Sequence, residues 1–175
     1  MKILVIDDKK KNLDSAKELL SDHEVTTVQT YDEGLGILDL RYANKMNHGF
    51  DVVLVDLLMP ASNHKQGHEG AKFIGQEMPI GIFLALLAAQ YGAKYVAVFS
   101  DTNHHDHPAS ACFDSFHKGV SFLPYVDEKT GETICDKDEH IVLRVNDAKL
   151  ILTNKESWIE TAKNWRKVLD YLLTC

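Results

Sequence analysis

Several features that would place a chain in a specialised class are scarce in this sequence of 175 residues. Its three cysteines, Cys112, Cys135 and Cys175, are too few and too scattered for a disulfide framework or a cysteine-based zinc site. The longest apolar run, residues 80–89, is about half of the roughly 20 residues that a membrane span needs. The first eight residues end in two acids, which is not typical of a secretory signal. We therefore expect a cytoplasmic protein that does not insert into a membrane.

An excess of positive charge is also absent. The chain carries 19 Lys and Arg against 26 Asp and Glu, for a net charge of −7. Non-specific nucleic-acid binding requires a basic face, so we expect no direct nucleic-acid binding. With 45% hydrophobic residues, the chain is long enough to bury a core and is most simply one domain.

Short apolar runs rich in β-branched residues alternate with segments of helical periodicity. The runs expected to be strands are 2–6, 24–30, 51–56, 94–100 and 120–124. Helices are expected near 10–21, from 31 to about 46, in the region around Pro79 up to residue 91, and near 108–116. Five such repeats predict an α/β fold with a parallel sheet and helices on both faces. Residues 141–152 indicate a further β-hairpin around Asn146-Asp147, and a C-terminal helix follows.

Acidic residues end several of the expected strands. Asp7 and Asp8 follow the first strand, Asp56 ends the third, and Ser100 ends the fourth. Ligands of open parallel sheets bind at the carboxyl ends of the strands, so we expect these side chains in one pocket. Clustered carboxylates repel each other unless a cation neutralises them, and oxygen ligands suit Mg²⁺ or Mn²⁺.

Two segments carry a family resemblance. "ILVIDDKKKNL" and "DVVLVDLLMP" resemble the receiver domain of bacterial response regulators, in the acidic pair, the Asn four residues beyond it and the D-x-x-M-P motif. The resemblance is good over residues 1–60 and loose over 93–125. It implies a flavodoxin-like, doubly wound sheet of five parallel strands in the order 2-1-3-4-5. Residues 1–175 would then form one receiver-like domain, with a hairpin insertion at about 127–153 and a C-terminal helix at about 155–173.

The resemblance also implies a chemistry. Asp56 would accept a phosphoryl group, Asp7 and Asp8 would help to bind Mg²⁺ together with Asp56, and Ser100 would be the switch hydroxyl. The donor would be a sensor histidine kinase or a phosphotransfer protein, and an unknown output protein would respond. An aspartate at a rigid strand end can attack phosphorus while a divalent ion neutralises the developing charge.

The sequence departs from the receiver pattern at the lysine that ends the fifth strand. Aligning "GVSFLPY" with that pattern puts Tyr125 where the lysine belongs. Lys118 is on the wrong side of the strand, and Lys149 could substitute only if the hairpin folds back. The stretch from Asp56 to Ser100 is also longer than in the family.

Histidines are concentrated in two loops that leave the same strand ends. His64 and His68 follow the third strand, and His104, His105 and His107 follow the fourth. We expect the latter three on the rim of the aspartate pocket. They could bind a transition metal, contact phosphate in place of the missing lysine, or form a solvated loop.

Three functional interpretations therefore stay open, and with them whether the protein is an enzyme. The leading one is an atypical, stand-alone receiver-like protein of a phosphorelay, which switches a protein partner. The second is a metal-dependent, hydrolase-like enzyme that uses the Asp and His pocket. The third is a pseudo-receiver that binds partners without phosphorylation.

Overall fold

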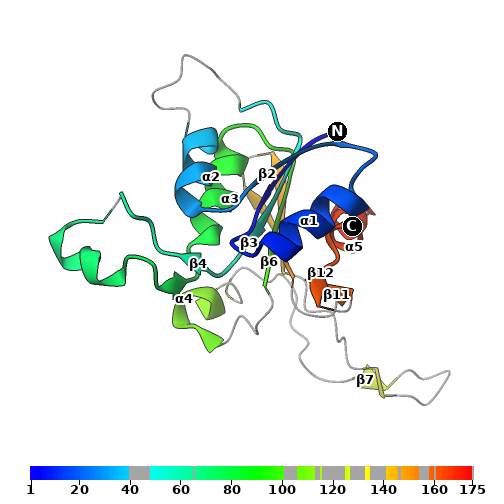
Figure 1. Cartoon of the computed structure of the whole chain (residues 1–175). Coiled ribbons are helices and arrows are strands. Elements are labelled where there is room, and N and C mark those ends of the chain that lie inside the picture. Colours follow the sequence, from blue (N-terminus) through cyan, green and yellow to red (C-terminus); the bar gives the residue numbers. More distant parts are fainter. Residues whose placement is uncertain are drawn as a thin grey trace.

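A six-stranded sheet forms the centre of the molecule (Figure 1). The computed structural model describes residues 1–39, 48–64, 66–100, 106–112, 115, 125–126, 133–134, 141–145, 147–153, 158–159 and 161–174. The strand order is β2-β1-β3-β6-β10-β9, and β9 alone runs antiparallel to its neighbour. The other five strands are therefore parallel. Numbered in the order in which they occur along the chain, they have the spatial order 2-1-3-4-5, which confirms the predicted flavodoxin-like fold class.

The amino-terminal half follows the predicted alternation closely. β1 (Lys2–Ile6), β2 (Glu24–Val28), β3 (Val52–Asp56) and β6 (Tyr95–Phe99) are the four expected strands. Residues Val52 to Asp56 are all buried, as expected for a strand covered on both faces. The apolar residues of β1 point alternately into two cores, with Leu4 and Ile6 in one and Ile3 and Val5 in the other.

Helices cover both faces of this sheet. α1 (Lys10–Leu19) and α5 (Trp165–Thr174) lie together on one face, and α2 (Tyr31–Leu38) and α3 (Gly81–Gln90) lie on the other (Figure 1). A capping box between Thr30 and Glu33 begins α2. α2 ends at Leu38, so it is shorter than the helix that the sequence predicts, and residues 40–47 are outside the described part.

The fifth parallel strand is a correction to the sequence analysis. β10 (Ala148–Thr153) pairs in parallel with β6 along its whole length, from Lys149 opposite Tyr95 to Thr153 opposite Phe99. β6 has β3 on its other side, so both of its edges are paired. Residues 120–124, which the sequence indicates as the fifth strand, lie outside the described residues. All six residues of β10 are buried, which explains why this strand takes the inner position.

The predicted hairpin is confirmed, with a different role. β9 (Ile141–Val145) and β10 are antiparallel partners, as the sequence indicates, but they belong to the main sheet. A second short hairpin, β11 (Trp158–Ile159) and β12 (Ala162–Lys163), lies between β10 and α5. The C-terminal helix therefore begins at Trp165 and not near residue 155.

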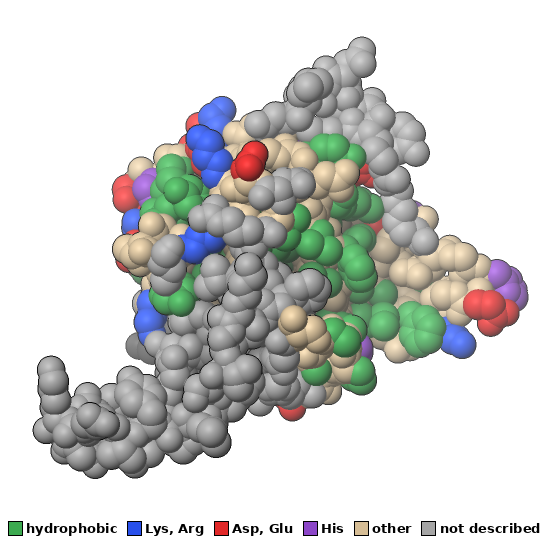
Figure 2. Space-filling view, turned by 180° about the vertical axis from the view of Figure 1, so that it is seen from behind, with side chains coloured by type: hydrophobic (Ala, Val, Ile, Leu, Met, Phe, Trp, Pro, Cys, Tyr) green, Lys and Arg blue, Asp and Glu red, His purple; other side chains and the backbone are tan. Residues whose placement is uncertain are grey.

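A lobe separates β3 from α3. Within it β4 (Met59–Pro60) pairs with β5 (Glu77–Met78), and the 3₁₀ helix η2 (His68–Phe73) lies between them. The lobe projects from the body of the molecule in Figure 2. Three further short elements are α4 (Pro108–Ala111) and the antiparallel pair of β7 (Tyr125–Val126) with β8 (Thr133–Ile134). Within the described residues, no helix is long and apolar enough to cross a bilayer.

Candidate functional site

Three carboxylates meet at the carboxyl edge of the sheet. Asp7 follows β1, Asp8 comes next, and Asp56 is the last residue of β3. One oxygen from each of them lies within 4.8 Å of the other two. Asp7 and Asp56 are fully buried and Asp8 is partly buried. The parallel register of β1 and β3 brings these residues together, as the strand-end argument predicts.

A lysine from the far end of the chain enters this cluster. Nζ of Lys163 lies 2.8 Å from Oδ2 of Asp7 and 2.8 Å from Oδ1 of Asp56, and it donates to the carbonyl of Phe99 at 3.0 Å. The Lys163 side chain has no exposed surface. These three contacts use all three protons of an ammonium group, so the charge is buried with a complete set of partners.

Lys163 also has an aromatic environment. Its Nζ lies 5.3 Å from the centroid of the Phe99 ring and 5.4 Å from that of the Trp165 ring. The two rings meet edge to face with centroids 5.5 Å apart. Both distances are within the range in which a ring attracts a cation, so the aromatic pair adds to the binding of the ammonium group.

The predicted alignment of Tyr125 with the lysine of the receiver pattern is wrong. Tyr125 belongs to the short strand β7, which pairs with β8 and is not in the main sheet. Lys149 is buried in β10, where its Nζ donates to the carbonyl of Leu172 near the end of α5. The signal that would have found Lys163 is order along the chain: "AKLILT" is the last long strand before the final helix, and Lys163 lies two residues before that helix begins.

Asn12 fixes the position of Lys163 relative to Asp7. Its Nδ2 donates to both Asp7 oxygens, at 2.9 and 3.0 Å, and its Oδ1 accepts from the backbone N–H of Lys163 at 3.2 Å. Ser15 on α1 donates to the Lys163 carbonyl, and the indole N–H of Trp165 donates to the Asn12 carbonyl. The β11–β12 hairpin is therefore held against α1 by hydrogen bonds on both sides of Lys163.

Asp7 is fully occupied by protein donors. Its Oδ1 accepts from the Lys9 backbone N–H and from Asn12, and its Oδ2 accepts from Asn12 and Lys163. A carboxylate has about four lone-pair sites, and all are used here. In this arrangement Asp7 orients Lys163, and the oxygens that suit direct contact with a cation belong to Asp8 and Asp56.

Asp8 has the properties expected of a metal ligand. Its Oδ1 is buried and has no hydrogen-bond partner among the described residues. Burial and the neighbouring Asp7 carboxylate raise the pKa of Asp8 above its ordinary value. Three carboxylates and one ammonium leave two negative charges uncompensated, and a divalent cation would balance them. The donor set fits Mg²⁺, which prefers carboxylate oxygens.

The first turn of α3 packs against the end of β3 at Asp56. The Gly81 N–H donates to the Leu57 carbonyl at 3.1 Å. A Cβ at Gly81 would lie only 1.8 Å from the Asp56 carbonyl oxygen, so no other residue fits without movement of the backbone. The Leu58 N–H in turn donates to Oδ1 of Asp56 at 3.3 Å.

Ser100 lies at the same edge. It follows β6, whose last residue Phe99 is opposite Asp56 in the register, and it is buried. Its backbone N–H donates to the carbonyl of Thr153, the last residue of β10. Asp7, Asp8, Asp56 and Ser100 therefore all lie at the carboxyl edge of one sheet.

Among the described residues, the histidines do not join the aspartate cluster. His104 and His105 lie outside the described residues. His107 begins α4, where its Nδ1 accepts from the Ala109 N–H at 3.1 Å. His64 and His68 are exposed on the lobe, and His68 contacts Glu69. Of the residues that the structure describes, only the three aspartates form a group able to hold a metal ion.

Comparisons with known proteins give limited support. No protein-family model and no curated protein matches the sequence. A solved structure described as a response regulator receiver domain protein from Clostridium thermocellum is similar, with 26% identity over 65% of this chain and 75% of the other. The TM-score is 0.41. At that score the similarity decides neither fold nor function, and both depend on the topology and site described above.

Proposed function

We propose that the protein is a receiver-like signalling protein that accepts a phosphoryl group on Asp56. The observation that carries this proposal is the contact of Lys163 with Asp56 and Asp7 in a buried cluster that also contains Asp8. A nucleophilic carboxylate, a cation for the incoming phosphoryl oxygens and oxygen ligands for a divalent ion are the parts that phosphoryl transfer needs.

In the proposed step a carboxylate oxygen of Asp56 attacks the phosphorus of a phosphohistidine. The new P–O bond forms as the P–N bond breaks, and the imidazole leaves with the electron pair and takes up a proton. The product is an acyl phosphate on Asp56. Mg²⁺, held by Asp8 and Asp56, would neutralise charge on the phosphoryl oxygens.

Lys163 would change its partner in this step. It now contacts the Asp56 carboxylate, and the phosphoryl oxygens would offer it a stronger anionic partner at the same edge. Ser100, which is buried at the end of the neighbouring strand, would supply a hydroxyl to the same group. Movement of Lys163 would be transmitted through the β11–β12 hairpin to α1 and α5, because Ser15, Asn12 and Trp165 hold that hairpin.

The partners follow from this chemistry. The donor would be a sensor histidine kinase or a phosphotransfer protein, and an output protein would recognise the changed surface. Asp56 has no exposed surface in this conformation, so the segments that cover it must move before a donor can reach the carboxylate. We therefore expect slow transfer from small donors.

The alternative of a metal-dependent hydrolase depended on histidine ligands at the pocket. His64 and His68 are exposed on the lobe, and among the described residues no histidine joins the aspartate cluster. No specific observation favours that alternative. The pseudo-receiver differs from our proposal only in the absence of phosphorylation, so it is an outcome of the test.

The test is phosphorylation by acetyl phosphate in the presence of Mg²⁺, followed by intact mass spectrometry. We expect one phosphoryl group that hydroxylamine removes, and none when a chelator replaces Mg²⁺. Asp56→Asn should abolish the labelling, because an amide is nearly isosteric but a poor nucleophile. Asp51→Asn is the matched control, since Asp51 lies just before the other end of the same strand and contacts the Lys2 N–H. Labelling of the Asp56→Asn variant at the wild-type rate would refute Asp56 as acceptor, and unlabelled wild type would leave the pseudo-receiver.

A further inference from the structure

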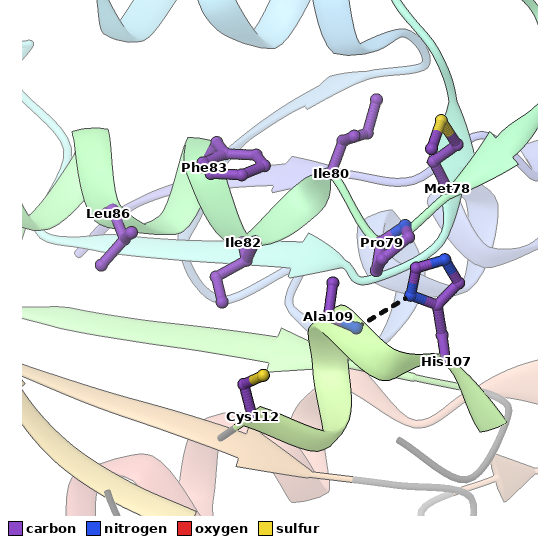
Figure 3. A pocket seen from close by; sticks show the side chains of 9 residues that line it. All are labelled: Met78, Pro79, Ile80, Ile82, Phe83, Leu86, His107, Ala109 and Cys112. Atoms are coloured by element: carbon purple, nitrogen blue, oxygen red, sulfur yellow. Dashed lines mark hydrogen bonds between the residues drawn. The ribbon is translucent and has the colours of Figure 1, made fainter. Parts of the chain in front are cut away.

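An apolar pocket lies between α3 and α4 (Figure 3). Its volume is about 310 Å³. The lining side chains come from the end of the lobe, from one side of α3 and from α4, and they are Met78, Pro79, Ile80, Ile82, Phe83, Leu86, His107, Ala109 and Cys112. Ligand sites are typically concavities of this size with an apolar lining and a few polar groups.

Large apolar side chains are exposed around this concavity. Phe83 is 55% exposed and Leu86 is 38% exposed, although both belong to a helix whose other face is buried in the core. Figure 2 shows hydrophobic side chains at the surface between the lobe and the body of the molecule. α3 is thus apolar on its outer face as well, and the part of this face that lines the pocket is exposed to water.

The pocket is largely preformed. Pro79 restricts the backbone on one side, and the Ile80 N–H donates to the Met78 carbonyl at 2.7 Å. The next residue, Gly81, is fixed against β3 by its bond to the Leu57 carbonyl. Opposite, the side chain of His107 caps the first turn of α4. A ligand would therefore lose little affinity to ordering of these walls.

The polar end of the pocket is at His107. Because Nδ1 accepts from the Ala109 N–H, the neutral ring carries its proton on Nε2. Nε2–H can therefore donate to a ligand, and among the described residues that line the pocket there is no carboxylate side chain. The Cys112 thiol donates to the Pro108 carbonyl at 3.2 Å and lies at the other end of α4 in Figure 3.

We infer that this pocket binds a small amphipathic monocarboxylate, with its apolar body against α3 and its carboxylate at His107. At ~30 Å³ for a water-sized group, the volume holds about ten such groups. Octanoate, with an eight-carbon chain, matches that size and serves as the probe. A ligand of about ten non-hydrogen atoms should bind with a dissociation constant on the order of 1 mM or tighter.

The test is titration of octanoate into the whole protein, with binding measured by calorimetry. In parallel, peptide mapping measures the rate at which iodoacetamide modifies Cys112. Octanoate should bind and slow the modification at Cys112. Octylammonium should bind about tenfold more weakly despite the negative net charge of the protein, because it cannot accept from His107. Equal binding of the two probes would refute the role of His107.

Variants separate this site from weak binding elsewhere. Ala109→Trp, at an exposed position, fills the pocket and should abolish binding. Leu86→Ala removes apolar lining and should weaken binding about tenfold. The matched control is Leu173→Ala, since Leu173 is 40% exposed on α5, on the other face of the sheet, and its loss should change nothing. Absence of octanoate binding at concentrations of about 10 mM, or unchanged binding by Ala109→Trp, would overturn the proposal, and a protein segment would then be the better candidate occupant.

Discussion

Nζ of Lys163 lies 2.8 Å from Oδ1 of Asp56, although one residue belongs to a hairpin near the end of the chain and the other ends a central strand. Both side chains are buried, and the same ammonium group also contacts Asp7. The contact joins the two halves of the chain at the proposed acceptor.

Loss of Lys163 should affect both the fold and the chemistry. Lys163→Met leaves Asp7 and Asp56 buried without their cation, which should cost about 3–5 kcal/mol of unfolding free energy. Labelling by acetyl phosphate should fall sharply. Urea unfolding and intact mass spectrometry measure the two effects.

Lys149→Met is the matched control for that variant. Lys149 is the other buried lysine among the described residues, and its Nζ donates to the Leu172 carbonyl near the end of α5. We expect lower stability, by about 1–3 kcal/mol, with labelling unchanged.

If Lys163→Met does not fold, Lys163→Arg keeps the charge and should fold with slower labelling. Wild-type labelling of either Lys163 variant would contradict a role for this residue in phosphoryl transfer.

Replacement of Asp8 should stabilise the protein when no metal is present. The pKa of Asp8 is raised in the folded state, so the folded protein holds this proton more tightly than the unfolded chain. Stability therefore falls as the pH rises from the unfolded value of 3.8 through the raised pKa. Asp8→Asn removes this loss, so its melting temperature should exceed that of the wild type at pH 7 and approach it below about pH 4.

Mg²⁺ should reverse that order. It should raise the melting temperature of the wild type by neutralising the carboxylates, and it should have little effect on Asp8→Asn. If millimolar Mg²⁺ does not change the melting temperature of the wild type, the proposed metal site is excluded.

Two glycines offer a paired test of the support behind Asp56. Gly81→Ala places a Cβ against the Asp56 carbonyl and should destabilise the fold by about 1–3 kcal/mol and slow the labelling. Gly36, in α2, has no atom within 4 Å of such a Cβ. Gly36→Ala should therefore stabilise the protein by about 0.5–1 kcal/mol and leave the labelling unchanged. Equal effects of the two replacements would show that the packing of Gly81 against Asp56 does not matter.

His48 should make the fold sensitive to mild acid. It accepts from the Phe50 N–H at Nδ1, and its Nε2 contacts the Ala88 carbonyl, which fixes the neutral ring. Burial lowers the pKa of His48 below 6.5. The unfolded chain therefore takes up the proton first, and stability falls as the pH drops from 6.5 through the lowered pKa.

The measurement for His48 is the melting temperature between about pH 7 and pH 5. His48→Gln should flatten the pH dependence in this range. His68→Gln, which replaces an imidazole that is 98% exposed, is the control. A dependence that is the same in the wild type and His48→Gln would assign the acid sensitivity to other groups.

Prediction from the sequence succeeded where a segment's environment is encoded locally. β1 and β3 are short, continuously apolar runs that end in aspartates, because strands covered on both faces need apolar residues along their whole length. Once these runs are parallel neighbours, their carboxyl ends must meet, so Asp7, Asp8 and Asp56 could be placed together in advance.

Prediction failed for the partner of β6. Residues 120–124 and 148–153 both have the composition of a strand, and composition does not say which run pairs with which. The strand that pairs with β6 is β10, whose six residues are all buried between the helices of the two faces. The family pattern, which places a lysine directly at the end of the fifth strand, then pointed to Tyr125 because the strand itself was misplaced.

The sequence by itself determined the parallel α/β fold and the carboxylate cluster, since both depend on local hydrophobic pattern and on the geometry of strand ends, and the resemblance to receiver domains supplied the order of the first four strands. Only the tertiary structure decided that Lys163 is the cation of the site. Ser15, Asn12 and Trp165 hold its hairpin against α1, and these contacts join residues more than 140 positions apart. A buried ammonium group needs partners from several elements, and no local pattern specifies partners so distant in the chain.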